Sequence, residues 1–101
     1  CFGDLDFIVE RDRKYLFVEF KYDDAPCTVA QRILLERLSE NNGFTVVKVN
    51  YTVDENSKMN CHSYQYYKSG TAKDVKQTST EELKNKFKIW DEVVTRKTGD
   101  K

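Results

Sequence analysis

The chain contains little glycine or proline and has no long apolar run. Its 101 residues include four glycines and one proline, with 39% apolar and 34% charged residues, which is typical of a folded domain rather than a disordered chain. A membrane-spanning helix needs about 18 consecutive apolar residues, and no segment approaches this length. We therefore expect a single domain over 1–101 that does not enter a membrane.

The sequence also lacks an excess of charge of either sign. Seventeen Lys and Arg residues balance seventeen Asp and Glu residues, which excludes a uniformly basic nucleic-acid-binding protein. The three cysteines, at positions 1, 27 and 61, cannot all pair and have no CxxC spacing, which favours a reduced setting. The first residues lack the basic and apolar stretches of a signal peptide. These features predict an intracellular, cytoplasmic protein.

Residue patterns predict alternating strands and helices. Runs of β-branched and aromatic residues indicate a hairpin of strands at 5–10 and 15–20 with a charged loop at 11–14. Thr28 and Gln31 form a capping box that opens a helix over about 28–41.

The second half of the chain predicts two more strands and a closing helix. The expected elements are a strand at 44–49, a polar loop at 50–63, a short strand at 64–68 and a helix opened by a capping box at 79–82, with Leu83, Phe87, Trp90 and Val94 along one face. The predicted fold class is α/β, with a central mixed sheet in β-β-α-β-β-α order flanked by helices.

The hairpin register predicts a cluster of charged side chains. If residues 11–14 form the loop, cross-strand partners have numbers that sum to 25, so Asp6 lies opposite Glu19 and Asp4 opposite Lys21. The two-residue period of a strand then puts these four on one face, beside Ile8 and Phe17. The opposite face is apolar and is expected to form core: Leu5, Phe7, Val9, Leu16, Val18 and Phe20.

Paired carboxylates require a compensating charge. With Cβ atoms about 5 Å apart, Asp6 and Glu19 repel each other, and either the Lys21 ammonium or a divalent cation can offset this repulsion. A metal ion, two carboxylates and a lysine are the parts that phosphodiester hydrolysis needs. The alternative is a solvated sheet face on which Asp4 and Lys21 form a surface ion pair.

The motifs in the first half of the chain resemble those of a known family. They are Gly3-Asp4-Leu5-Asp6-Phe7-Ile8-Val9, Val18-Glu19-Phe20-Lys21 and the helical Gln31. Together they resemble the PD-(D/E)xK nuclease superfamily, most of all its VRR-NUC-like and phage Holliday-junction-resolvase-like members, although Leu5 stands where the family name has Pro. The resemblance covers residues 3 to about 49 and implies a restriction-endonuclease-like fold.

The resemblance also implies an activity and a set of site residues. Asp6, Glu19 and the main-chain carbonyl of Phe20 are expected to hold Mg²⁺ or Mn²⁺, Lys21 to position the attacking water, and Gln31 to support the site. The implied reaction is metal-dependent cleavage of DNA in a phage or mobile-element context. A non-catalytic nucleic-acid-binding or assembly module of the same fold is the alternative.

Three features leave alternatives open. Gln31 occupies the N3 position of its capping box, so it has a structural role that competes with a role in the site. Asp4 is an acid that contacts a metal ligand rather than the metal, a ligand of a second metal, or the partner of Lys21. Related folds usually open with a helix and a strand before the hairpin, so the domain is expected to be trimmed at its N terminus or completed by another chain.

Two basic segments are the candidates for contacting DNA. The residues are Arg11, Arg13 and Lys14 at the hairpin tip, and Tyr64, Tyr66, Lys68 and Lys73 farther along. For the second group the alternative is an edge strand whose lysines discourage edge pairing. Because cutting both strands with one such site usually requires two copies, a homodimer is also open. Adjacent Cys61 and His62 lack the second pair of ligands that a zinc site needs.

Overall fold

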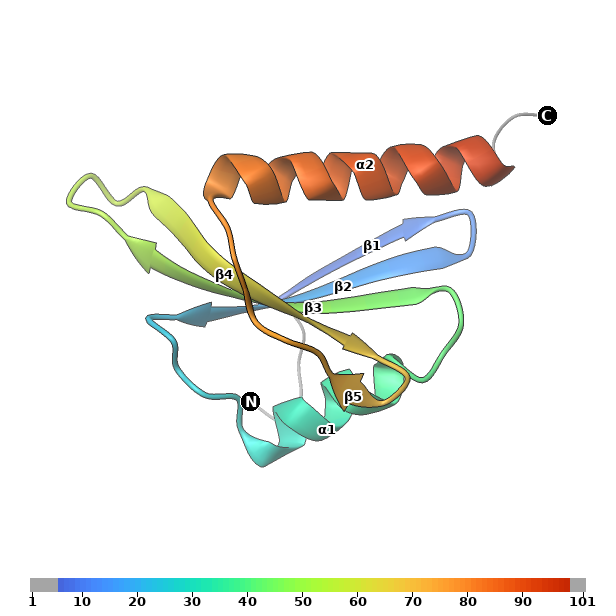
Figure 1. Cartoon of the computed structure of the whole chain (residues 1–101), viewed down its shortest axis with the longest axis horizontal. Coiled ribbons are helices and arrows are strands. Elements are labelled where there is room, and N and C mark those ends of the chain that lie inside the picture. The colour runs from blue at the N-terminus through green and yellow to red at the C-terminus, as the bar shows by residue number, and fades with distance from the viewer. Residues whose placement is uncertain (1–5, 99–101) are drawn as a thin grey trace.

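The computed structural model describes residues 6–98, which form one mixed sheet with a helix on each face (Figure 1). The strands are β1 (Phe7–Arg11), β2 (Lys14–Tyr22), β3 (Phe44–Val53), β4 (Met59–Lys68), β5 (Thr71–Ala72) and β6 (Lys76–Gln77), and the helices are α1 (Val29–Leu38) and α2 (Thr80–Thr98). The α/β class with a mixed sheet is confirmed. Neither helix in the described part of the chain has the length and apolarity needed to cross a membrane.

The sheet order is β1-β2-β3-β4-β5, with β6 also pairing with β4. Strands β2 and β3 are parallel and α1 connects them, whereas the other pairs are antiparallel. A helical crossover therefore joins the two parallel strands, and the short strands β5 and β6 are not predicted by the sequence. A parallel pair needs such a crossover because the chain must return to the same end of the sheet.

The hairpin register is confirmed, but its loop is shorter than expected. Phe7 pairs with Val18, and the ladder continues to Arg11 and Lys14, whose numbers also sum to 25. Only Asp12 and Arg13 form the turn, with φ angles of 51° and 71°. Two consecutive residues with positive φ match the twist of the flanking strands. The prediction of a loop over 11–14 was therefore wrong at both ends.

The polar segment 50–63 is mostly strand rather than loop. Strand β3 continues to Val53 and β4 begins at Met59, so only residues 54–58 form the connection. The polar side chains that suggested a loop pair with each other across the sheet: Asn50 Nδ2 donates to Ser63 Oγ at 3.1 Å, and both residues are buried. A cross-strand hydrogen bond satisfies part of their polarity inside the sheet.

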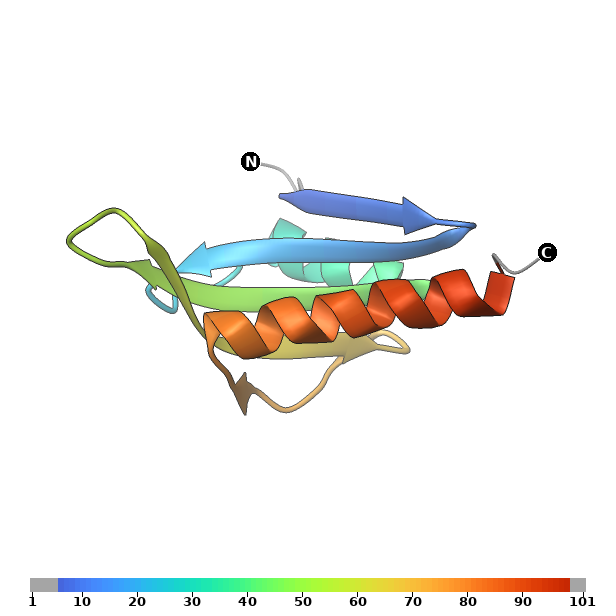
Figure 2. The same cartoon turned by 90° about the horizontal axis from the view of Figure 1, so that it is seen from above.

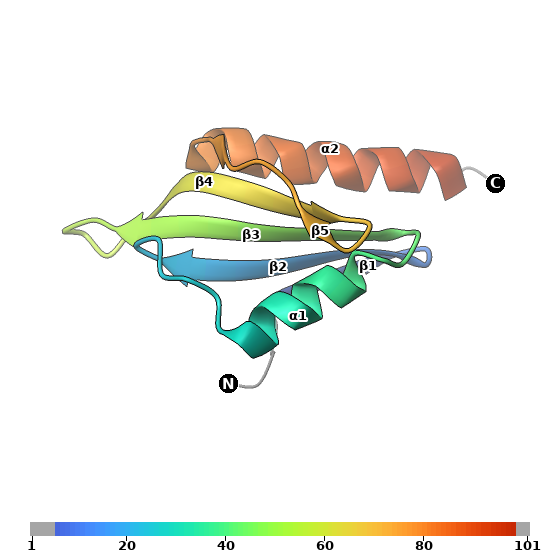
Figure 3. The same cartoon turned by 60° about the horizontal axis from the view of Figure 1, so that its bottom comes forward.

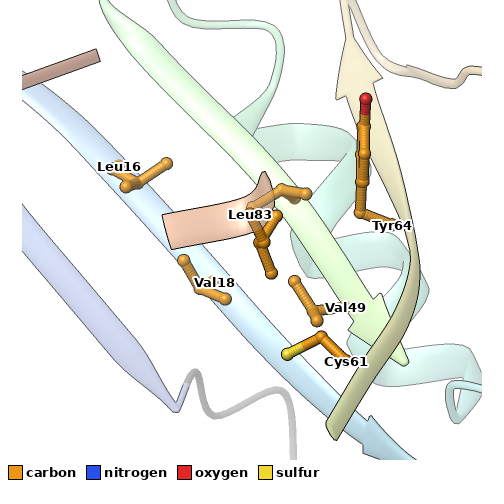
Figure 4. Packing of buried hydrophobic residues seen from close by; sticks show 7 residues of the cluster. Leu16, Val18, Val49, Cys61, Tyr64 and Leu83 are labelled. Atoms are coloured by element: carbon orange, nitrogen blue, oxygen red, sulfur yellow. The ribbon is translucent and has the colours of Figure 1, made fainter. Parts of the chain in front are cut away.

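The larger part of the core lies between the sheet and α2. Figure 4 shows Leu16, Val18, Val49, Cys61, Tyr64 and Leu83 of this cluster. The predicted apolar stripe of α2 is confirmed, because Leu83 and Val94 are buried and Phe87 and Trp90 pack against the cluster. Two hydrogen bonds fasten the helix to the sheet: Cys61 N donates to Thr80 Oγ1 at 2.9 Å, and Trp90 Nε1 to Thr45 Oγ1 at 3.2 Å.

The prediction that Phe7 belongs to the core was wrong. Its side chain faces α2 but is 46% exposed, because β1 is the edge strand; in the view of Figure 2, α2 runs over β3 and β4. Phe7 instead lines an apolar groove of about 290 Å³ with Phe20 and Phe87. Leu5, expected on the same face, lies outside the described residues.

Helix α1 covers the other face with a smaller core. Phe17, Leu35, Val46 and Tyr67 form its buried cluster. The helix ends at Leu38 rather than near 41, because Asn41 Nδ2 donates to the last carbonyl groups and residue 43 turns the chain with a φ of 89° that favours glycine.

The turn between β3 and β4 gives a prediction about pH. Asp54 Oδ1 accepts hydrogen bonds from Asn56 N at 2.8 Å and Lys58 N at 2.9 Å. The bonds from Lys58 and Asn56 to the charged form hold the pKa of Asp54 below its ordinary value of 3.8.

A carboxyl group with a lowered pKa stabilises the fold at neutral pH, and its contribution is lost as the pH falls through the lowered value. In an NMR titration we expect the Asp54 carboxyl carbon to change with a midpoint below 3.8. Asp54→Ala should lower the free energy of unfolding at pH 7 and lose that effect in strong acid. A midpoint at or above 3.8 would contradict the assignment.

Candidate functional site

The end of β2 brings Glu19 and Lys21 to the face that α1 covers. Alternate residues of a strand point to the same side, so these two follow Phe17 of the α1-side core. The Glu19 side chain is only 5% exposed and that of Lys21 14%, and Lys21 Nζ lies 3.7 Å from Glu19 Oε2. A carboxylate so deeply buried is costly unless a cation and hydrogen bonds compensate it, and Lys21 supplies that cation.

Gln31 joins these two residues to the start of α1. The capping box is present: Gln31 N donates to Thr28 Oγ1 at 3.1 Å, and Thr28 N donates to Gln31 Oε1 at 3.0 Å. The same side chain accepts a hydrogen bond from Lys21 Nζ at 2.5 Å and donates one from Nε2 to Glu19 Oε2 at 3.1 Å. The structural and site interpretations of Gln31 are therefore compatible, because one buried amide makes a hydrogen bond of the capping box and those to Glu19 and Lys21.

Asp6 lies beside this network at the start of the described chain. It is exposed, and its Oδ2 accepts a hydrogen bond from Phe20 N at 2.8 Å. The N–H and C=O groups of one strand residue point to the same side of the strand. The Phe20 carbonyl is therefore directed to the same side of β2 as the Phe20 N–H. Asp6 thus stands next to the Phe20 peptide and on the side of β2 opposite β3.

These groups fit a magnesium-like cation in the type of their donors. Two carboxylates, from Asp6 and Glu19, and the Phe20 carbonyl supply hard oxygen atoms, and Mg²⁺ commonly takes one or two carboxylates while keeping several waters. Within residues 6–98 there is no group of three His, Cys, Asp or Glu side chains that could hold a metal. Asp4, expected as a further ligand or as the partner of Lys21, lies outside the described residues.

The predicted contacts at the hairpin tip lie away from this network. Lys14 is five residues before Glu19 on β2, which corresponds to about 17 Å along the strand. Arg11 Nε forms an ion pair with Asp91 of α2 at 2.9 Å, and Arg13 N donates to Glu10 Oε2 at 2.7 Å. Arg11 therefore fastens the hairpin to α2.

The second predicted group lines one groove at the β4 edge. Tyr64, Tyr66, Lys68 and Lys73 all border this groove of about 490 Å³. Both tyrosines belong to the α2-side core, however, so they lie on the opposite face from Glu19 and Lys21. Lys86 Nζ stands 5.6 Å from the centre of the Tyr64 ring, and burial raises the pKa of Tyr66. The structure groups these residues but does not join them to the candidate site.

Sequence reasoning missed two neighbours of the site on β3. In the parallel register Lys48 pairs with Glu19 and Asn50 with Lys21, so both residues are presented on the α1 face. The residue pattern could not identify them as neighbours of the site. Alternation within 44–49 assigns Lys48 to one face of the strand, but it does not give its partner on β2. Cys61 is buried under α2, while His62 contacts Thr52, with 2.5 Å between its Nε2 and the Thr52 hydroxyl.

Replacing Lys21 tests the charge balance of the network. In Lys21→Met the Glu19 carboxylate keeps its buried place without the ammonium, and we expect the free energy of unfolding at pH 7 to fall by about 3 kcal/mol in urea titrations.

The double variant Glu19→Gln, Lys21→Met serves as the matched control. It removes both charges, and Gln at 19 still accepts a hydrogen bond from Gln31, so its stability should lie closer to that of the unchanged protein. Equal losses in the single and double variants would show that the two charges do not compensate each other.

Comparison with known proteins does not assign the chain to a family. No protein-family model matches the chain, and neither a curated protein nor a solved structure matches it. The case for a function therefore rests on the arrangement of Asp6, Glu19, Lys21 and Gln31.

Proposed function

We propose that this protein is a metal-dependent endonuclease that hydrolyses phosphodiester bonds of DNA. The observation that carries the proposal is the network of Glu19, Lys21 and Gln31. A Glu-x-Lys pair at the end of a strand buries a carboxylate and an ammonium together, and a helical glutamine contacts both. Hydrophobic side chains could fill this place without the cost of desolvating two charges. A chemical role therefore explains Glu19 and Lys21 better than stability does.

The order of elements supports the same proposal. An antiparallel hairpin, a crossover helix and a parallel strand bring together Asp6 before β1, Glu19 of β2 and Gln31 of α1 at one end of the sheet. We propose that this is the restriction-endonuclease-like arrangement that the motifs of the first half of the chain resemble.

Each side chain has a defined part in the proposed reaction. Asp6, Glu19 and the Phe20 carbonyl would hold a Mg²⁺ or Mn²⁺ ion. When bound, the ion would supply positive charge to the phosphate and lower the pKa of a coordinated water. Lys21 donates hydrogen bonds to the attacking water or to a phosphate oxygen, where its charge offsets the charge that develops on the phosphate. Gln31 orients the Lys21 ammonium toward the attacking water and the phosphate.

A second function has its own supporting observation. The described residues contribute only two carboxylates to the site, and Asp6 already accepts the Phe20 N–H. A module of the same fold that binds nucleic acid or another protein without cutting it needs no further ligand. Cleavage assays separate the two functions.

Supercoiled, linear and branched DNA should each be incubated with the protein in Mg²⁺, in Mn²⁺ and in EDTA. We expect cleavage that requires the metal and that falls by at least about a hundredfold in Glu19→Gln and in Lys21→Met. Nicked rather than linear products from a supercoiled plasmid indicate a single site acting alone, and linear products indicate two copies acting together.

Glu92→Gln is the matched control, because Glu92 is an exposed carboxylate on α2, on the other side of the sheet. It should cut as the unchanged protein does. Cleavage that persists in Glu19→Gln would refute the site. DNA binding without cleavage in either metal would favour the non-catalytic module.

A further inference from the structure

Two residues of β3, Lys48 and Asn50, lie beside the candidate site. Lys48 is paired with Glu19 and Asn50 with Lys21, and adjacent strands are only about 4.8 Å apart. In Figure 3 the C-terminal ends of β2 and β3 extend past the first turn of α1. Lys48 is partly exposed, and the residue beside it on β4 is Gln65, so the strip next to the acids is polar and reachable.

The Asn50 side chain has one buried atom that the described chain does not satisfy. Asn50 is 8% exposed, and its Nδ2 donates to Ser63 Oγ. Its Oδ1 is buried and has no hydrogen-bond partner among the described residues. A buried acceptor left without a donor costs about 1–3 kcal/mol, so stability does not explain why an asparagine stands beside Lys21.

The charges of the side chains around Lys48 indicate which class of ligand binds there. Asp6 and Glu19 carry two negative charges, and Lys21 and Lys48 carry two positive ones. Lys48 has no ion-pair partner within 4.0 Å in the part of the chain that the structure describes, whereas Lys21 is held by Glu19 and Gln31. A divalent cation at the acids gives the group a net charge of +2, which attracts a polyanion and leaves Lys48 to contact it.

We propose that the site continues onto β3, where Lys48 binds a phosphate group of the nucleic-acid strand. This inference rests on the proposed function, and it places the DNA on the α1 side of the sheet rather than on the tyrosine groove of the α2 side.

Salt dependence of binding tests the role of Lys48. Binding of a labelled DNA duplex should be followed by fluorescence anisotropy in Ca²⁺, a hard cation that also takes oxygen ligands. Lys48→Gln should weaken binding and reduce the slope of log affinity against log salt by about one. The affinity lost between 50 and 200 mM salt should then be about fourfold smaller than for the unchanged protein.

Lys86→Gln is the matched control, because it removes the same charge from the opposite face, where Lys86 lies over Tyr64. It should leave the salt slope unchanged. Equal behaviour of the two variants would overturn the proposal. Thermal unfolding followed by circular dichroism confirms that both variants are folded under the assay conditions.

The outcomes separate this inference from the proposed function. If the protein cuts DNA but Lys48→Gln matches Lys86→Gln, only the inference fails. If no condition gives cleavage while Lys48→Gln still lowers the salt slope, the nuclease proposal fails and the phosphate contact stands.

Discussion

The side-chain amide of Gln31 holds the end of β2 to the start of α1. Its oxygen accepts from Thr28 N and from Lys21 Nζ, and its nitrogen donates to Glu19. Because a single amide makes these bonds, the first turn of the helix, the position of the ammonium and the environment of the carboxylate are set together. Any substitution at this residue changes folding and chemistry at once, so its functional part is best measured through Lys21 and Glu19.

Local patterns in the sequence were sufficient for the hairpin, the capping box of α1 and the α2 stripe. Each of these depends on residues close together in the chain, such as the cross-strand pairs of β1 with β2 or the spacing from Leu83 to Val94. The extension of β3 and β4 through 50–63 was missed because the hydrogen bond between Asn50 and Ser63 makes buried polar residues compatible with a strand. Composition alone cannot show that two distant polar residues will meet.

From residue spacing the candidate site was predictable only as far as the hairpin reaches, and Gln31 was assigned to it only through the family resemblance. Glu19 and Lys21 share a face by the two-residue period, but the arrival of Gln31 and Lys48 depends on the crossover and on the parallel register. The same limit applies to Tyr64 and Tyr66. Their aromatic character beside lysines suggested contact with nucleic acid, yet strand alternation turns them under α2, away from the acids.

Both ends of α1 are tied to the sheet. At its C-terminal end the carbonyl oxygen of Ser39 accepts from Ser69 N at 3.0 Å and its hydroxyl accepts from Gly70 N at 2.9 Å, in the turn between β4 and β5. At the other end Gln31 holds β2. A helix fixed at two points cannot roll independently of the strands, so the groups that Gln31 orients are ordered before any ligand arrives. Binding then carries little ordering entropy for the chain, and the turn at residues 69–70, far along the sequence, becomes a mechanical support of the site.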